Sequence, residues 1–313
     1  MKPLVILTGP TAVGKTDLSI KLAKRINGEI ISADSMQVYR GMDIGSAKIT
    51  EEEKCGIKHY LIDVLDPTED FNVSLFKDMA KKAIDEIYKK GMIPIITGGT
   101  GFYIQALLYD VDFNESDGED TKLREMLTKE ADEKGADILF ERLKKIDPES
   151  AKIIHKNNIK RVIRAIEFYE QTGTKISDHN KEQHENESPY NFSYFVLTDD
   201  RDKIYDRINK RVDIMLDKGL VKEVETLKNK GLSLKNISMQ GLGYKEILAY
   251  LDGSITLDEA VEILKRDTRH FAKRQLTWFR REKNVTFIDK SQFKSDEDIL
   301  LFMTEDMKAK KII

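Results

Sequence analysis

The stretch Gly9-Pro10-Thr11-Ala12-Val13-Gly14-Lys15-Thr16 decides the fold, because it has the spacing of a phosphate-binding loop, G-x-x-x-x-G-K-[ST]. The apolar run at residues 4–7 is typical of a buried parallel strand, and residues 18, 22 and 26 recur at helical spacing behind the loop. A loop between a strand and a helix N-terminus can point several backbone N–H groups at one anion. The sequence therefore predicts that all eight residues hold a diphosphate or polyphosphate. Lys15 would supply a cation, and Thr16 a hydroxyl ligand for Mg²⁺.

The first hundred residues alternate between strand and helix patterns. Strands are expected at 4–7, 29–33, 59–64 and 92–97, and helices at 15–26, 73–89 and from 101. Such alternation is typical of a parallel sheet with helices on both faces, in which ligands bind at the carboxyl ends of the strands. The predicted fold class is a P-loop NTPase-like α/β core.

From residue 110 to 190 the strand signals stop, which predicts a small all-helical domain inserted into the core. Helices are expected at 121–134, 137–145, 148–155 and 159–171, and a polar loop at 177–188. A strand at 191–197 returns the chain to the core, followed by helices at 201–216, 219–229 and 257–282. The expected domains are a catalytic core (1–109 with 191–313) and a helical insertion (110–190).

The composition limits the cellular compartment and the kind of binding partner that can be expected. The chain of 313 residues has a net charge of −3 and one cysteine, Cys55, which excludes an internal disulfide. Without a signal-peptide pattern or a run of roughly 20 apolar residues, a cytoplasmic protein without a membrane partner is expected. Residues 265–283 carry eight basic side chains against two acidic ones. This local excess favours one localised anionic partner.

Two further motifs would join the phosphate loop at the same sheet edge. Asp34 follows the strand at 29–33, where a carboxylate could accept a proton or orient Mg²⁺-bound water, although a turn or helix-capping aspartate fits equally well. Gly98-Gly99-Thr100-Gly101 suits close approach of the backbone to an anion, with an ordinary helix start capped by Thr100 as the alternative. Asp63 is expected inside its strand, so the strand-end aspartate of motor and switch NTPases is missing.

Two basic helices complete the pattern. In 160–167, Arg161 and Arg164 share one face while Val162, Ile166 and Tyr169 form another. In the long helix the basic stripe is interleaved with Gln275, Trp278 and Phe279, as a surface that binds phosphates and unstacked bases would be. A solvated amphipathic helix is the usual explanation of such a stripe and remains open.

Seven motifs together carry a resemblance to a known family: GPTAVGKT (9–16), ADSMQVYRGMDIGSAK (33–48), HYLIDVLDP (59–67), GGTGFY (98–103), KRVIRAIE (160–167), MQGLGYKE (239–246) and TRHFAKRQLTWFRR (268–281). In this order, along essentially the whole chain, they resemble the bacterial tRNA dimethylallyltransferases. The departures are small: Ser46 in place of a threonine, Tyr60 in place of a second histidine, and Asn158 in place of an aspartate.

The resemblance implies transfer of a dimethylallyl group from dimethylallyl diphosphate to N6 of the adenosine just 3′ of the anticodon, with Mg²⁺ and a monomeric enzyme. The phosphate loop would hold the leaving diphosphate, and Asp34 would accept the amine proton. Ser35, Met36 and Gln37 would line the adenine pocket, with Thr100 and Arg124 at the reaction centre. Further contacts with the tRNA anticodon stem-loop are implied for Lys160, Arg161, Val162, Ile163, Arg164, Met239, Gln240, Gly241, Gly243, Tyr244, Lys273, Arg274, Gln275, Trp278 and Arg280.

Three other functions share part of the pattern. A P-loop kinase for a nucleotide or small metabolite explains the loop and Mg²⁺ but not the RNA-like basic helices. A non-catalytic RNA-binding NTPase switch lacks its strand-end aspartate. A transferase that prenylates free adenine nucleotides would have little use for the basic segments.

Overall fold

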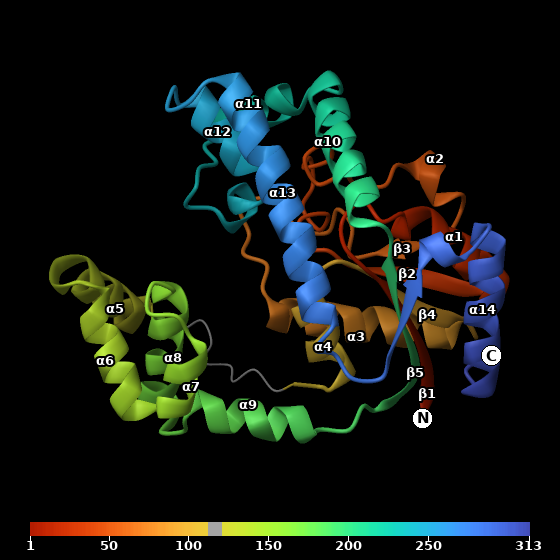
Figure 1. Ribbon diagram of the computed structural model, residues 1–313, viewed down its shortest axis with the longest axis horizontal. Coiled ribbons are helices and arrows are strands. Elements are labelled where there is room, and N and C mark those ends of the chain that lie inside the picture. The colour runs from red at the N-terminus through yellow and green to blue at the C-terminus, as the bar shows by residue number, and fades with distance from the viewer. Residues whose placement is uncertain (112–120) are drawn as a thin grey trace. The chain divides into compact units, whose positions relative to one another are not determined.

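The computed structural model describes residues 1–111 and 121–313 and separates into two compact units (Figure 1). We call Met1–Leu107 with Pro189–Ile313 the core unit, and Leu108–Ser188 the helical unit. Within the described residues, no helix combines the length and the hydropathy that crossing a membrane requires.

The core unit is built on a six-stranded sheet in the order β3-β2-β4-β1-β5-β6, and every paired strand runs parallel to its neighbour. This confirms the predicted parallel α/β fold. The register places Thr8, the last residue of β1, beside Gly98 of β4 and Val196 of β5. The strands are β1 (Lys2–Thr8), β2 (Gly28–Ala33), β3 (His59–Tyr60), β4 (Ile93–Gly98), β5 (Tyr190–Thr198) and β6 (Val285–Asp289).

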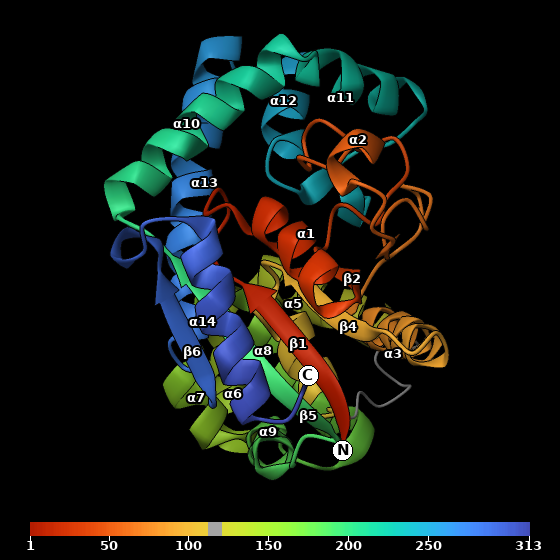
Figure 2. The same ribbon diagram turned by 90° about the vertical axis from the view of Figure 1, so that its right-hand side faces the viewer.

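Helices pack on both faces of this sheet. On one face lie α1 and α14 (Figure 2). Their apolar side chains share a core with alternate residues of β1 such as Val5 and Leu7. On the other, α3 packs against β2 and β4 through Phe76 and Ile84. The core-unit helices are α1 (Lys15–Ile26), α2 (Glu51–Lys54), α3 (Val73–Lys89), α4 (Gly101–Leu108, whose last residue belongs to the helical unit), α10 (Arg201–Asp217), α11 (Leu220–Asn229), α12 (Tyr244–Leu251), α13 (Leu257–Phe279) and α14 (Asp296–Ala309), with 3₁₀ turns η2 (Ile237–Gln240) and η3 (Lys290–Gln292).

The helical unit has its own apolar core, formed by side chains such as Leu127, Leu143 and Ile166. Asn158 caps the N-terminus of its helix α8: the Asn158 side chain accepts a hydrogen bond from the Arg161 amide, as an aspartate there would. The helices are α5 (Thr121–Lys134), α6 (Ala136–Ile146), α7 (Pro148–Ile153), α8 (Ile159–Thr172) and α9 (Ile176–Glu185). Residues 112–120 of the expected insertion lie outside the described residues.

The expected loop at 177–188 is wrong, because residues 176–185 form α9. The helix has no apolar stripe for the sequence to reveal. Its start is held instead by buried Asp147, which accepts a hydrogen bond from the Ser177 amide (2.9 Å) while also capping α7 through Ser150. The His179 ring then packs on Phe168 at 5.0 Å between centroids. Tertiary contacts therefore stabilise a helix that local pattern does not predict.

The expected strand at 59–64 is also wrong beyond Tyr60. Leu61 and Asp63 adopt positive φ angles of 61° and 56°, which a strand does not allow. The Asp63 carboxylate binds Lys48 Nζ at 2.5 Å, so this aspartate anchors a loop. The pattern also missed α12, β6 and α14, and it ran the long helix three residues past its end at Phe279.

Candidate functional site

The phosphate loop joins β1 to α1 at the centre of the sheet. Gly14, with φ at 93°, precedes the first helical residue, and Ala12 adopts a left-handed φ of 62° that is uncommon for a residue with a side chain. Gly9 is needed for close packing, because a Cβ there would lie 2.5 Å from the carbonyl oxygen of Leu197. The loop therefore has the curled backbone that turns amides toward an anion.

The Lys15 side chain folds back over this loop. Its Nζ donates hydrogen bonds to the carbonyl oxygens of Gly9 (3.0 Å) and Pro10 (2.8 Å). Burial, with the nearby Arg211 charge, lowers the pKa of Lys15 to about 7, while Asp34 acts in the opposite direction. A bound diphosphate would supply the missing counter-charge and favour the protonated amine.

Further cations reach the loop from two segments that follow β5, and no motif of the sequence predicted them. Arg207 of α10 donates to the Ala12 carbonyl (3.2 Å) and pairs with Asp199. Lys290, directly after β6, places its Nζ 3.1 Å from where a Gly14 Cβ would stand. The available signal was the i, i+4 spacing of Arg207 and Arg211 on the first helix after β5.

Asp34 stands at the carboxyl end of β2, where the structure shows the turn aspartate that was one of its two predicted roles. Its Oδ1 accepts hydrogen bonds from the amides of Met36 (2.8 Å) and Gln37 (3.3 Å), which makes it a turn aspartate. Its Oδ2 has no hydrogen-bond partner among the described residues. One oxygen thus shapes the turn, and the other is available to a substrate.

The two residues after Ser35 are also positioned by contacts. Gln37 Nε2 donates to the carbonyl oxygens of Ser46 (3.4 Å) and Ala47 (3.3 Å). The Met36 side chain lies against Gly241, where a Cβ would come within 2.5 Å of Met36 Cε. Gly241 therefore gives Met36 room.

Two glycines of the 98–101 turn lie against side chains from the long helix α13. A Cβ at Gly99 would lie 2.1 Å from Gln275 Nε2, and one at Gly101 would lie 2.2 Å from Trp278 Cδ1. These glycines make room for side chains of α13. Thr100 precedes α4, its carbonyl accepts the Tyr103 amide (3.0 Å), and its hydroxyl has no partner among the described residues.

Gln275 is buried, with 6% of its surface exposed, and both ends of its side-chain amide form hydrogen bonds. Oε1 accepts from the Thr11 amide (2.9 Å), and Nε2 donates to the Gly99 carbonyl (3.0 Å). The side chain thus ties the phosphate loop to the 98–101 turn. The expected RNA contact of Gln275 is corrected on this ground.

Comparison with known proteins identifies relatives of this chain. A model of the IPP transferase family matches residues 37–282, more than half of the chain. The chain belongs to the IPP transferase family. It is 61% identical over 313 residues to a tRNA dimethylallyltransferase of Lachnoclostridium phytofermentans, covering 100% of both chains. It is also 58% identical over 300 residues to the enzyme of that name from Acetivibrio thermocellus, covering 96% of each.

Two solved structures share the fold of this chain. The crystal structure of the tRNA isopentenylpyrophosphate transferase from Bacillus halodurans is 46% identical, with a TM-score of 0.74, and the match covers 99% of this chain and 98% of that one. A eukaryotic dimethylallyltransferase acting on tRNA is 29% identical, with a TM-score of 0.83, and the match covers 99% of this chain and 80% of that one.

Several residues expected at the RNA surface of this IPP transferase are buried instead. Met239 and Tyr244 are 0% exposed in the core unit, and Val162 and Ile163 pack inside the helical unit. Their buried side chains stabilise the packing of the helices and turns on which they lie. Arg124 of α5 binds the buried Glu167 carboxylate through two 2.9 Å hydrogen bonds.

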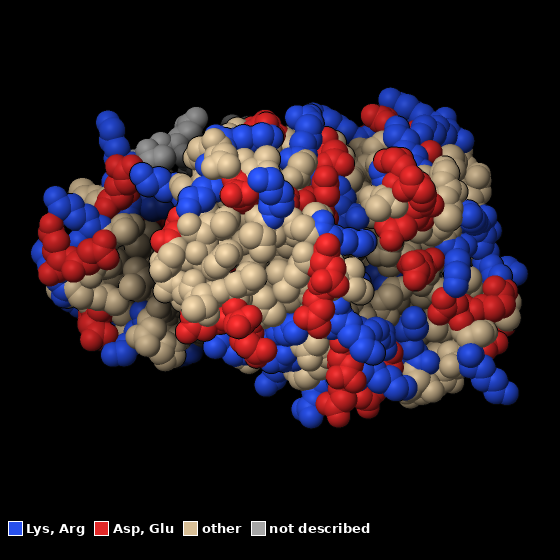
Figure 3. Space-filling model, turned by 90° about the horizontal axis from the view of Figure 1, so that it is seen from above, with Lys and Arg blue, Asp and Glu red and all other residues tan. Residues whose placement is uncertain are grey.

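The exposed members of the expected set are mostly basic: Arg124, Lys160, Arg161, Gln240, Lys273, Arg274 and Arg280. On the face drawn in Figure 3, acidic and basic side chains are interspersed around an uncharged area. That face is therefore not uniformly basic, in keeping with the net charge of −3.

Replacing Gln275 with alanine is expected to lower the free energy of unfolding by about 1–3 kcal/mol, because the Thr11 amide and the Gly99 carbonyl lose their partner. Gln275→Glu should also destabilise, since one carboxylate oxygen would face the Gly99 carbonyl oxygen. Urea unfolding measures both, with Thr277→Ala as the control because Thr277 is an exposed residue of the same helix. Equal stability of the Gln275→Ala and Thr277→Ala variants would contradict the tie.

Proposed function

We propose that this protein transfers the dimethylallyl group of dimethylallyl diphosphate to N6 of the adenosine just 3′ of the anticodon in tRNA. The observation that carries the proposal is the pairing of two chemistries at one sheet edge. A phosphate loop bearing Lys15 lies within electrostatic reach of Asp34, whose Oδ2 is free of partners among the described residues. Family membership and tRNA transferases among the relatives support it.

In this reaction the bond from the dimethylallyl carbon to the diphosphate oxygen breaks, and a bond from that carbon to N6 forms. Negative charge grows on the diphosphate, where the loop amides and Lys15 stabilise it. The adenine amine is a poor nucleophile and must lose a proton, for which Asp34 Oδ2 is the acceptor. The target base is stacked in a free anticodon loop, so it must be extruded to reach Asp34, at a cost of a few kcal/mol.

The residues present fit Mg²⁺ as the cofactor. The Thr16 hydroxyl, at the exposed start of α1, has no partner among the described residues, which also contain no cluster of three or more His, Cys, Asp or Glu side chains able to hold a metal. Mg²⁺ usually takes only one or two protein oxygens and completes its shell with phosphate and water. When bound, it would neutralise charge on the leaving diphosphate, with Thr16 as its protein ligand.

A kinase is the alternative that shares the loop and the metal. The relatives reported above are tRNA transferases, which favours prenyl transfer. A kinase would also leave the exposed basic residues of α8 and α13 without a use. The same residues argue against an enzyme that prenylates free adenine nucleotides.

We further propose that the anticodon stem-loop contacts exposed basic side chains such as those of Lys160, Arg161 and Arg280. The buried residues of the same segments would support tRNA binding only by packing the helices that carry these side chains. The enzyme would work as a monomer in the cytoplasm, where its tRNA substrate is present.

Incubation with isoprenoid-labelled dimethylallyl diphosphate or γ-labelled ATP, each with and without unmodified tRNA, tests the proposal. We expect isoprenoid label in tRNA, digested to N6-dimethylallyladenosine, and loss of this product on chelation of Mg²⁺. Transfer of the γ-phosphoryl group to an acceptor, with no isoprenoid label in tRNA, would establish a kinase instead.

The double variant Arg161→Ala/Arg164→Ala should weaken tRNA binding and flatten its salt dependence. Each lost phosphate contact reduces the slope of log K against log salt by about 0.7 to 0.9. Filter binding at several salt concentrations measures the slope. Lys129→Ala/Lys134→Ala is the charge-matched control, because these exposed lysines of α5 pair with acidic side chains of their own helix. Equal slopes for the two double variants would reject the assignment.

A further inference from the structure

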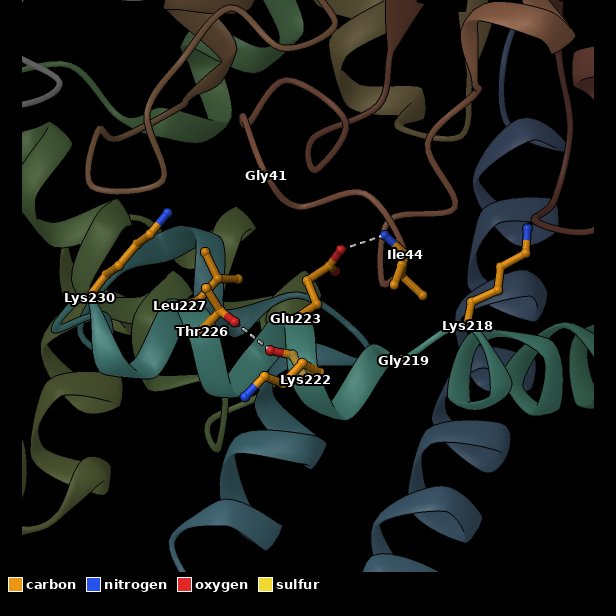
Figure 4. A pocket seen from close by; sticks show the side chains of 9 residues that line it. All are labelled: Gly41, Ile44, Lys218, Gly219, Lys222, Glu223, Thr226, Leu227 and Lys230. Atoms are coloured by element: carbon orange, nitrogen blue, oxygen red, sulfur yellow. Dashed lines mark hydrogen bonds between the residues drawn. The ribbon is translucent and has the colours of Figure 1, made fainter.

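Glu223 of α11 reaches across to the loop at residues 43–45, on the same segment as Asp34. Its Oε2 accepts hydrogen bonds from the backbone amides of Asp43 (2.9 Å) and Ile44 (2.8 Å). Its Oε1 accepts from the Gly45 amide (3.0 Å) and the Tyr244 hydroxyl (2.8 Å). Figure 4 shows the carboxylate pointing from the helix to Ile44. Four donors thus converge on one side chain.

Three consecutive amides that face one anion form a nest, and hydrogen bonds to a charged acceptor are stronger than neutral ones. Tyr244 completes the nest from a fully buried position, and burial together with Glu223 raises the pKa of this tyrosine well above its usual value. The phenol therefore stays protonated and donates. A Cβ at Gly45 would lie 2.6 Å from Tyr244 Cζ, so the ring also fixes where this loop can run.

The held loop in turn orients Gln37. The two carbonyl oxygens that accept from Gln37 Nε2 belong to Ser46 and Ala47, the residues directly after the nest. The backbone N–H of Gln37 is one of the two donors to Asp34 Oδ1. A continuous chain of contacts therefore runs from Glu223, through 43–47, to the turn that presents Asp34 and Gln37.

We infer that Glu223 is a positioning residue for the transfer reaction: it sets the Gln37 side chain, and with it the orientation of the target adenosine beside Asp34. The inference rests on the proposed function, since it assigns Gln37 to the adenine pocket. Dimethylallyl diphosphate binding should not depend on Glu223, because the phosphate loop is held by other residues, among them Gln275 and Arg207.

The surroundings of Glu223 make this testable without unfolding the protein. A hollow of about 430 Å³ opens beside the contact, between Gly41 and Ile44 of the loop and Glu223 and Thr226 of α11 (Figure 4). If Glu223 is shortened, water from this hollow can reach the freed amides. The loop then loses its fixed position, while its donors avoid the cost of being buried without partners.

The test compares Glu223→Ala with Glu225→Ala, a carboxylate of the same helix that pairs with exposed Lys222 and does not contact the loop. Steady-state kinetics should show a fall in kcat/KM for tRNA on the order of 10²-fold for Glu223→Ala, the usual effect of a small misplacement. The KM for dimethylallyl diphosphate should stay at the wild-type value, and Glu225→Ala should match wild type throughout.

A double-variant cycle with Gln37→Ala separates positioning from a structural tether. If Glu223 acts through Gln37, removing Glu223 should cost little in the Gln37→Ala background, because interacting residues are not additive. Equal losses in both backgrounds, or no loss in either, would overturn the inference. If Glu223→Ala does not fold, Glu223→Gln and Tyr244→Phe enter the same cycle, since each removes or opposes only one or two of the four contacts. A wild-type enzyme that fails to prenylate tRNA would instead reject the proposed function.

Discussion

Asp34→Asn will lower turnover by about 10²–10⁴-fold, the usual contribution of a general base. Asparagine suits the test better than alanine, because its side-chain oxygen can still accept from the Met36 and Gln37 amides and so preserve the turn. What it loses is the ability of the second position, now an NH₂ group, to accept the N6 proton. Asp34→Ala should show the same loss, with some added disorder of the turn.

Single-turnover rates with saturating tRNA and dimethylallyl diphosphate measure the chemical step, and equilibrium binding measures tRNA affinity. We expect near-wild-type affinity in both variants. Glu225→Gln is a control, since Glu225 is a carboxylate that pairs with exposed Lys222 and does not contact this segment. Wild-type turnover of Asp34→Asn would show that the proton leaves by another route.

Lys15→Met should lower kcat/KM for dimethylallyl diphosphate by about 10²–10³-fold, as expected for loss of one preorganised donor to a developing anion. Lys21→Met is the matched control, because Lys21 lies on the same helix but forms an exposed ion pair with Asp296. Its kcat/KM should stay at the wild-type value. If Lys21→Met lowered kcat/KM as much as Lys15→Met does, the effect would come from the total positive charge of α1 and not from a donor in the phosphate loop.

Lys15 also predicts a pH dependence whose sign follows from its lowered pKa of about 7 in the ligand-free protein. Below pH 7 the amine is already charged, so an anion binds without recruiting a proton. Above pH 7 the amine is neutral, and binding must first take up a proton because the anion raises the pKa. Calorimetry with inorganic diphosphate should therefore show affinity falling, and proton uptake rising, as pH increases through 7. Lys15→Met should lose both effects.

Local pattern was sufficient wherever a segment carries its own periodicity or its own backbone requirement. The phosphate loop, α1, α3 and the strands β1, β2, β4 and β5 combine apolar spacing with glycines at turns, and the structure has them within a few residues of the expected bounds. Family membership followed from the same motifs in order along the chain.

Pattern failed where the stabilising partner is far away in sequence. Helix α9 depends on contacts with Asp147 and Phe168. The short β3 ends at Tyr60, and the loop that follows it is held by the ion pair between Asp63 and Lys48. Strand β6 is recognisable only beside β5. The glycines at 99 and 101 were visible from the start, but their reason, the Gln275 and Trp278 side chains, lies more than 170 residues along the chain.

The amino-acid order alone thus predicted a phosphate-loop motif, a parallel sheet and Asp34 as a candidate carboxylate at the end of a strand, because each of these depends on neighbours a few residues away. Only the folded chain showed that Gln275 joins the loop to the 98–101 turn, that Arg207 and Lys290 approach the loop, and that Glu223 holds the 43–45 amides. Hydrogen bonds and charges act over a few ångströms of space whatever the separation along the chain, so such partnerships leave no local periodicity in a single sequence.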